Sequence, residues 1–295
     1  RKYLEYGVTT IKNTGDLRDA MLTLKARLKS GDLQGPRLLV VGPPLTAWGG
    51  HPAASLFREN EWFRSRGAAE VRTVLTARSM VADLALAEFD AIKLVFEEGE
   101  NRIKLAPEIM RAIIDESDRQ NLRVTVHTKH VEDAIAVIEA GADGLEHGVM
   151  LGKLSDRRLA TLMRERGAVY VPTLQVIERF GPDGLPVAMS NLKQLAEEGV
   201  SIALGSDTFG NMPRGTSTVR EAELMVQAGL TTAQVIQAAT HNAAAHLGIL
   251  SDVGTVEPGK LADLIMVDGN PLADIAALRR IEVVIQSGEI VVDKR

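Results

Sequence analysis

Short apolar segments alternate with amphipathic segments along most of this 295-residue chain, and this alternation constrains the fold more than any other feature. The apolar segments run without polar interruption, which predicts strands that are buried on both faces. Strands that alternate with helices across short turns are typical of parallel βα units. Seven strands are predicted, at Val8–Ile11, Leu38–Val41, Ala91–Phe96, Val124–His127, Gly144–His147, Val169–Thr173 and Ser201–Ser206.

Helices with apolar residues at helical spacing are predicted between these strands. They cover Asp16–Leu33, Ala68–Leu86, Pro107–Gln120, Val131–Ala140, Asp156–Arg166 and Ala188–Glu198, and a long loop is predicted from residue 42 to about residue 67. The fold class predicted from this order is α/β, a TIM-type (β/α)8 barrel, a fold that typically takes about 250 residues. The count is one strand short of eight, and we expect the missing first strand to lie before Gly7.

The pattern changes in the last third of the chain. Two further helices are predicted at Val219–Ala228 and Thr232–Leu247. Beyond Gly248 come short β-rich segments, Gly254–Val256, Leu264–Val267, Val283–Gln286 and Ile290–Val292, separated by turn residues. The prediction is therefore a barrel domain over residues 1–248 and a small β-sandwich portion over residues 249–295.

Composition narrows the classes of partner. The net charge is −5, from 34 basic and 39 acidic residues, so the chain lacks the basic excess typical of proteins that bind nucleic acid or anionic membranes. No apolar run approaches the roughly 18–20 residues that a membrane span needs. We expect a cytoplasmic homo-oligomer that binds a small-molecule substrate. The chain has no cysteine, so any metal ion must be held by His, Asp, Glu or a modified Lys.

Four polar residues mark the predicted strands at the end where TIM barrels carry their catalytic groups. Lys93 lies within one apolar strand, His127 and His147 end two others, and Asp207 follows the last. Each has an ordinary structural explanation: a hydrogen-bonded histidine, a helix-capping aspartate, or a lysine that extends to the barrel rim. Their joint placement on four strands instead predicts a metal site made of two imidazoles, a carboxylate and a lysine that can become an anion.

Several local motifs point to one family. They are Gly7-Val8-Thr9-Thr10, Gly49-Gly50-His51, Ala91-Ile92-Lys93, Val126-His127-Thr128, Glu146-His147-Gly148, Gly205-Ser206-Asp207, Thr240-His241-Asn242-Ala243-Ala244 and the segment from Gly254 to Leu264. In this order the motifs resemble the amidohydrolase superfamily, specifically its imidazolonepropionase-like and prolidase-like branch. The resemblance extends over nearly the whole chain.

The resemblance implies a mechanism. The family uses two divalent metals, usually zinc, bridged by a carboxylated lysine and a hydroxide, and some relatives use one metal. Lys93 would be the carboxylated lysine, and His127 and His147 would hold the more exposed metal. Asp207 would bind the other metal, take a proton from the attacking water and pass it to the leaving amine. Such a site hydrolyses a C–N bond of the amide type.

One family feature is missing from the sequence. The first strand of the family carries a His-x-His pair, and none of the six histidines here forms one. Three interpretations remain open: the segment precedes Arg1 in a longer protein, another chain supplies it, or the barrel has lost it and is a non-catalytic binding or structural protein.

A second departure concerns the substrate. Lys129 stands where relatives often carry a tyrosine, and Lys129 and His51 are predicted to bind a substrate carboxylate; Lys129 as a solvated loop residue is the alternative. The acidic run Glu97-Glu98-Gly99-Glu100 is interpreted as a solvated loop, and His241 and His246 as packing or surface residues. The predicted substrate is a dipeptide or an N-acyl amino acid, with a cyclic amide as the alternative.

Overall fold

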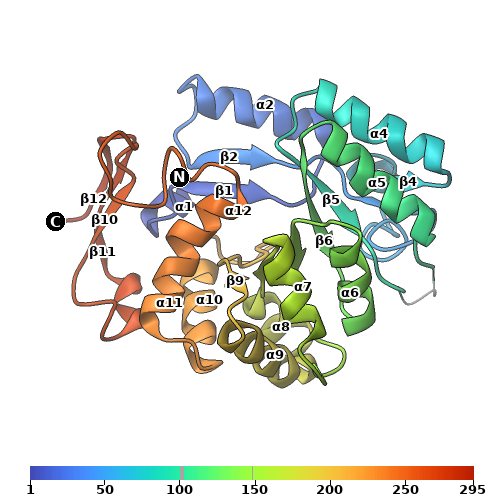
Figure 1. The fold of residues 1–295 in the computed structure, drawn as a ribbon. Coiled ribbons are helices and arrows are strands. Elements are labelled where there is room, and N and C mark those ends of the chain that lie inside the picture. Colours follow the sequence, from blue (N-terminus) through green and yellow to red (C-terminus); the bar gives the residue numbers. More distant parts are fainter. Residues whose placement is uncertain (100–102, 148) are drawn as a thin grey trace.

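The computed structural model describes residues 1–99, 103–147 and 149–295, in which helices surround a set of short parallel strands (Figure 1). Seven of the strands form one sheet in the order β4-β3-β5-β6-β7-β8-β9, and every neighbouring pair is parallel. Their bounds are β3 Leu45–Ala47, β4 Ala69–Val71, β5 Ala91–Val95, β6 Arg123–His127, β7 Gly144–Glu146, β8 Val169–Val171 and β9 Ser201–Ile202. This register brings the carboxyl ends of β5 to β9 to one end of the sheet.

Helices follow the strands and cover them on the outside (Figure 1). They are α2 Arg18–Lys29, α3 Glu61–Gly67, α4 Val74–Leu86, α5 Pro107–Arg119, α6 Val131–Glu139, α7 Arg158–Arg166, α8 Leu174–Phe180, α9 Leu185–Glu197, α10 Thr216–Gln227, α11 Thr232–Gln237 and α12 Ala243–His246. A single large cluster of buried apolar residues fills the space between strands and helices, with Ile92, Val124, Val126 and Leu145 fully buried. The strands are thus buried on both faces, as their continuous apolar sequence predicts.

Two more strands, β1 (Thr10–Asn13) and β2 (Arg37–Val40), pair in parallel beside this sheet. Asp90, just before β5, joins the two sheets, because its backbone N–H donates to the Val40 carbonyl at 2.8 Å and its carboxylate accepts from the Val40 N–H at 2.7 Å. All seven predicted strands are therefore present. The predicted TIM-barrel-like α/β fold is confirmed.

The structure corrects several predicted boundaries. The predicted loop from residue 42 to about 67 contains β3 and α3, and the predicted helix Ala68–Leu86 begins with a strand, β4, that pairs with β3. Helix α4 starts only after Thr73, whose side chain accepts a hydrogen bond from the Thr76 N–H. The predicted strands Val169–Thr173 and Ser201–Ser206 end early, at Val171 and Ile202, because the chain turns out of the sheet there.

The C-terminal segment forms a separate antiparallel sheet in the order β10-β11-β12, at Leu264–Val267, Ile281–Gln286 and Glu289–Asp293. The predicted strand Gly254–Val256 is wrong, because these residues form a bend and an extended stretch instead. The sheet lies beside the N-terminal helix α1 (Lys2–Glu5), and the Lys294 ammonium donates to the Glu5 carbonyl at 2.6 Å.

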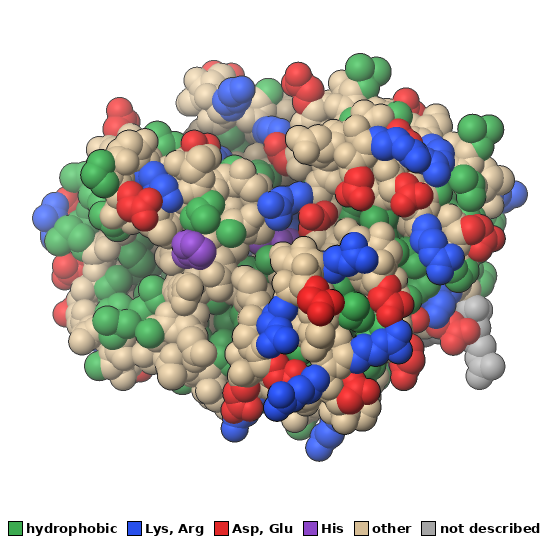
Figure 2. Space-filling model, viewed as in Figure 1, with side chains coloured by type: hydrophobic (Ala, Val, Ile, Leu, Met, Phe, Trp, Pro, Cys, Tyr) green, Lys and Arg blue, Asp and Glu red, His purple; other side chains and the backbone are tan. Residues whose placement is uncertain are grey.

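On the face shown in Figure 2, acidic and basic side chains are interspersed over the helices, and apolar side chains lie on both sides of the view. In the C-terminal sheet, Leu264, Ile265, Met266 and Ile290 are exposed. No helix in the part of the chain that the structure describes is long and apolar enough to cross a bilayer.

Candidate active site

The four predicted ligand residues come from four neighbouring strands. Lys93 is the central residue of β5, His127 ends β6, His147 directly follows β7, and Asp207 lies in the loop after β9. His147 and Asp207 have positive φ angles of 62° and 45°. Left-handed backbone is unfavourable for residues other than glycine and collects at functional sites. Here it turns both side chains out of the strand direction.

The structure brings these four side chains together. The rings of His127 and His147 meet edge to face with centroids 4.7 Å apart. His147 Nδ1 lies 3.6 Å from Asp207 Oδ2. Lys93 is buried among them, close enough to Asp207 for that carboxylate to act on its charge. The set predicted from strand ends therefore forms one cluster at the carboxyl end of the barrel strands.

Burial sets the charge state of this cluster. Burial lowers the pKa of His127 to about 4 and that of His147 to about 3, although Glu97 and Asp207 respectively act in the opposite direction. Both imidazoles are therefore neutral near pH 7, which is the form that binds a metal ion. Burial also lowers the pKa of Lys93 to about 8, against the carboxylates of Glu146 and Asp207.

The cluster fits a divalent metal on the evidence of one unpaired atom. Lys93 Nζ is buried and has no hydrogen-bond partner among the described residues. A buried polar atom without a partner costs free energy and calls for an explanation such as an ion. Two neutral imidazoles, a carboxylate and an amine supply the nitrogen and oxygen donors that zinc and similar ions take.

Glu97 corrects the interpretation of the acidic run as a solvated loop. Its side chain is only 3% exposed, and Oε2 lies 3.1 Å from His127 Nε2 and 2.9 Å from Lys129 Nζ. Burial alone would raise the pKa of Glu97, but the contacts of His127 and Lys129 outweigh it and hold the pKa well below its usual range. Glu100 of the same run lies outside the described residues, as does Gly148 of the motif around His147.

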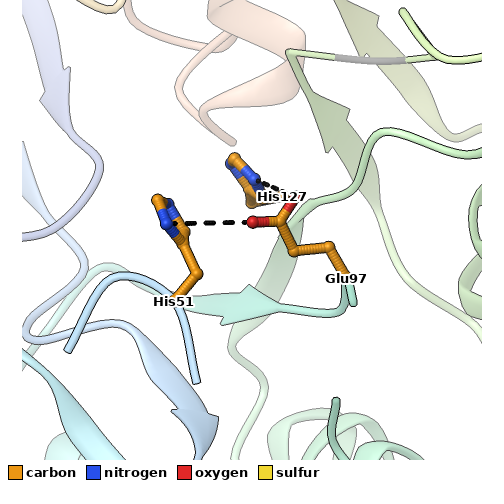
Figure 3. Close-up of side chains that lie close together, drawn as sticks. All are labelled: His51, Glu97 and His127. Atoms are coloured by element: carbon orange, nitrogen blue, oxygen red, sulfur yellow. Dashed lines mark ion pairs between the residues drawn. The ribbon is translucent and has the colours of Figure 1, made fainter. Parts of the chain in front are cut away.

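His51 reaches the same place from the loop after β3 (Figure 3). Its ring stacks on that of His127 with centroids 5.0 Å apart, and Nδ1 lies 3.8 Å from Glu97 Oε1. Burial lowers the pKa of His51 to about 4, against the carboxylate of Glu97. Ligand atoms of His51, Glu97 and His127 all lie within 4.8 Å of one another, so these three residues also have the geometry to hold a metal ion.

The two candidate groups share His127 and form one continuous polar cluster. His127 contacts His147 of the first group. It also contacts His51 and Glu97 of the second group, and Glu97 in turn contacts Lys129. The predicted substrate residues His51 and Lys129 thus border the predicted metal ligands. Glu97 escaped prediction, although it carries the same signal as His127: a polar residue at the carboxyl end of an apolar strand.

A second buried polar group occupies the barrel interior below Lys93. Glu146 Oε1 lies 2.6 Å from Lys12 Nζ and accepts from the Thr125 hydroxyl at 2.6 Å, and Lys12 Nζ lies 2.8 Å from His246 Nε2. Burial would raise the pKa of Glu146, but Lys12 and His246 hold it well below its usual range. His246 is thus a buried residue that packs against an ion pair.

Comparison with known proteins gives the family. The model of the amidohydrolase family matches residues 1–291. This chain belongs to the amidohydrolase family. It is 32% identical over 195 residues to an ochratoxinase of Aspergillus niger, covering 61% of this chain and 39% of that protein. It is 27% identical over 277 residues to an imidazolonepropionase of Caldanaerobacter subterraneus subsp. tengcongensis, covering 90% of this chain and 60% of that protein.

Solved structures of similar proteins show the same fold. A Xaa-Pro dipeptidase with methionine bound in its active site is 27% identical, with a TM-score of 0.82 over 98% of this chain and 76% of that one. The A. niger ochratoxinase structure is 24% identical, with a TM-score of 0.84 over 99% of this chain and 74% of that one, and it shares the fold. The matched region spans only 39% of the length of the ochratoxinase and 60% of the length of the imidazolonepropionase.

Acid should destabilise the metal-free form of this amidohydrolase. His51, His127 and His147 have lowered pKa values in the folded chain but take up protons in the unfolded chain as the pH falls below 6.5. The unfolded state then binds more protons, so the free energy of unfolding decreases as the pH falls from 7 to 5. At pH 4, one imidazole whose pKa drops from 6.5 to about 4 costs roughly 3 kcal/mol.

Urea titrations of the metal-free protein at pH 7, 6 and 5 measure this effect. The midpoint should fall at each step, and the His127→Gln variant should show a shallower dependence. A midpoint that stays constant from pH 7 to pH 5 would contradict the neutral, buried state of these imidazoles.

Proposed function

We propose that this chain hydrolyses the C–N bond of a peptide-like or N-acyl amino acid amide, using one or two divalent metal ions, most simply zinc. The single observation that carries the proposal is the buried Lys93 amine, which has no hydrogen-bond partner in the described part of the chain and faces two neutral imidazoles and Asp207. A metal bound there lowers the pKa of water and polarises the substrate carbonyl.

Lys93 would serve this site as a carbamate. Only a neutral amine reacts with carbon dioxide; the nitrogen–carbon bond forms and one proton is released. Burial lowers the pKa of Lys93 to about 8, so roughly a tenth of the amine is neutral near pH 7, far more than for an exposed lysine. The product is an anion. Carboxylation thus removes a positive charge that would repel metal ions and provides an oxygen ligand in its place. His127, His147 and Asp207 would complete the set of ligands.

Asp207 is proposed to move the protons. It lies at the cluster beside His147, with its side chain only partly buried, so it can contact both water and a bound substrate. Amide hydrolysis requires a base that accepts a proton from water and an acid that returns one to the departing amine, whose own basicity makes it a poor leaving group. One carboxylate can do both in turn.

The substrate proposal rests on the polar residues beside the metal ligands. Lys129 and His51 offer an ammonium and an imidazole beside the metal ligands, which suits a substrate that carries a carboxylate next to the scissile amide. The resemblance to a Xaa-Pro dipeptidase supports dipeptides. The imidazolonepropionase relatives support the second candidate, a cyclic amide.

A substrate panel tests these candidates against each other. The protein expressed from its natural gene and supplied with zinc would be assayed on dipeptides, N-acyl amino acids, lactams and imidazolones. Turnover of the first two classes supports the proposal, and turnover of the cyclic amides alone selects the second candidate. Metal analysis that finds no bound zinc, together with no turnover, would favour the third hypothesis, a non-catalytic barrel that binds a ligand or a partner.

Replacing Lys129 by methionine should raise KM for substrates with a free carboxylate. A hydrogen bond to a charged group contributes about 1.5–3 kcal/mol, which corresponds to a roughly 10- to 100-fold change in KM. The same substrates with the carboxylate converted to an amide should change little. Steady-state kinetics on each pair of substrates measures the difference, and Lys193→Met, at an exposed lysine, is the control.

A variant of Glu97 provides a second test of Lys129, because Glu97 competes with a substrate carboxylate for the Lys129 ammonium. The Glu97→Gln variant should therefore lower KM for the same substrates. If Glu97 instead ligates the metal, this variant should lose zinc, so metal content and KM together assign its role. Equal KM values for both kinds of substrate in the Lys129→Met variant would remove Lys129 from the substrate site.

A further inference from the structure

A buried carboxyl group outside the metal cluster holds the backbone beside His147. Glu221, on α10, is fully buried, and its two oxygens accept from the backbone N–H groups of Leu174 at 2.9 Å and Gln175 at 2.7 Å. These are the first two residues of α8. Burial raises the pKa of Glu221 to about 8, against these two hydrogen bonds, so the group is mostly a neutral carboxyl near pH 7. Its oxygens satisfy two free N–H groups of the helix start from a position 46 to 47 residues further along the chain.

The residue just before α8 is Thr173, and both its backbone and its side chain are unusual. Its φ angle of 47° is left-handed, a conformation that β-branched residues rarely adopt. A threonine at a helix start ordinarily uses its hydroxyl to accept from the helix N–H groups, but Thr173 makes no such bond. Glu221 takes these N–H groups instead, which leaves the Thr173 hydroxyl free for another partner.

That partner is His147. The Thr173 hydroxyl lies 3.0 Å from His147 Nδ1, and Thr173 is 1% exposed, so water does not compete for the contact. Asp207 Oδ2 lies 3.6 Å from the same nitrogen. Two oxygens beside Nδ1, one of them a carboxylate oxygen, favour the tautomer with the proton on Nδ1. In that tautomer Nε2 has the free lone pair that a metal ion needs.

We propose that Thr173 and Glu221 are positioning residues, which hold His147 in the Nδ1–H tautomer with Nε2 available to the metal. Glu221 fixes the backbone at the start of α8, and that backbone places the Thr173 hydroxyl against His147. The inference rests on the proposed function for the role of His147 as a ligand. Metal-binding histidines commonly donate their second ring nitrogen to a fixed oxygen, and loss of that oxygen weakens metal binding about 10- to 100-fold.

Three variants separate positioning from general stability. Thr173→Val keeps the shape of the side chain and removes the hydroxyl, whereas Thr173→Ser keeps the hydroxyl. Glu221→Gln keeps the size but turns an amide N–H₂ group toward one of the two backbone N–H groups. Ser117→Ala is the control, because the Ser117 hydroxyl is equally buried but donates to the Ile113 carbonyl within its own helix, α5.

Two readouts are used: the tautomer of His147, from nitrogen-15 NMR of the metal-free protein, and the zinc dissociation constant, from competition with a chelator. The original protein and Thr173→Ser should show the Nδ1–H tautomer and similar zinc affinity. Thr173→Val should show a mixture of tautomers and about 10- to 100-fold weaker zinc binding. Glu221→Gln should change both readouts in the same direction, and Ser117→Ala should change neither.

An unchanged tautomer and zinc affinity in folded Thr173→Val would overturn the inference. If Glu221→Gln does not fold, Thr173→Val and Thr173→Ser still decide the role of the hydroxyl. A failure of the proposed function would give a different result. The original protein would then bind no zinc, whereas the tautomer of His147 would still change in Thr173→Val.

Discussion

Replacing Lys93 by alanine is expected to lower kcat/KM by about a thousandfold or more and to reduce the zinc content of the purified protein. Metal polarisation of the carbonyl and activation of water are together worth several kcal/mol of barrier, and each 1.36 kcal/mol is tenfold in rate. Lys93 is the one buried lysine of the cluster, and its Nζ has no other partner within the described residues. Metal analysis and steady-state kinetics on the same preparation measure both effects.

The Lys93→Ala variant also leaves space that a small carboxylic acid can enter. If the functional form of Lys93 is a carbamate, acetate or propionate in the buffer should restore part of the activity and of the zinc content. The Lys153→Met variant, at an exposed lysine, is the control for loss of a positive charge. Full zinc content and full activity in Lys93→Ala would contradict the ligand role, and a lack of rescue would argue against the carbamate.

The fold was predictable wherever a strand is buried on both faces, because such a strand leaves a continuous apolar segment in the sequence. Strands β5, β6 and β7 follow this rule, and their predicted bounds agree with the structure within one residue. The region of β3 and β4 does not. Each of these strands has three residues, and they pair with each other across a segment whose aromatic and turn residues show no period.

Helix α8 was missed for a related reason. It has only seven residues and directly follows the predicted strand Val169–Thr173, so it leaves too short a pattern to be recognised as a helix. Its first N–H groups are satisfied by Glu221, which lies on another helix. A helix whose start depends on a distant side chain carries no local signal for that start.

The site was predictable to the same degree. Lys93, His127 and His147 were found because parallel strands bring their carboxyl ends to one edge. Glu97 obeys the same rule but was read together with Glu98 as part of a charged loop. Its burial depends on His127 and Lys129, which belong to the next strand and the loop that follows it.

The ion pair of Lys12 and Glu146 shows the limit of such reasoning. The two residues lie 134 positions apart, Lys12 in β1 and Glu146 in β7, and the sequence around each gives no sign of its partner. Both charges are tolerable inside the barrel only because they meet there, and His246 adds a third polar contact from α12. The order of strands places them in one interior, but only the three-dimensional structure shows the contact.

Replacing Asp207 by asparagine should separate proton transfer from metal binding. Asparagine keeps a carbonyl oxygen that can still ligate a metal, but it cannot accept a proton from water or return one to an amine. General acid–base groups contribute about 10²- to 10⁴-fold, so kcat should fall by that factor. KM and the zinc content should change far less than in Lys93→Ala, and metal analysis beside steady-state kinetics measures the contrast.

The leaving group provides the decisive control for Asp207. An amine departs only after it is protonated, whereas a nitrophenolate departs without a proton. Asp207→Asn should therefore lose much more activity on an amide than on the matching nitrophenyl ester, because the ester does not need the second proton transfer. Asp183→Asn, at an exposed acid, should leave both rates unchanged. Equal losses on amide and ester would mean that Asp207 acts through the metal or the fold and does not deliver a proton to the departing nitrogen.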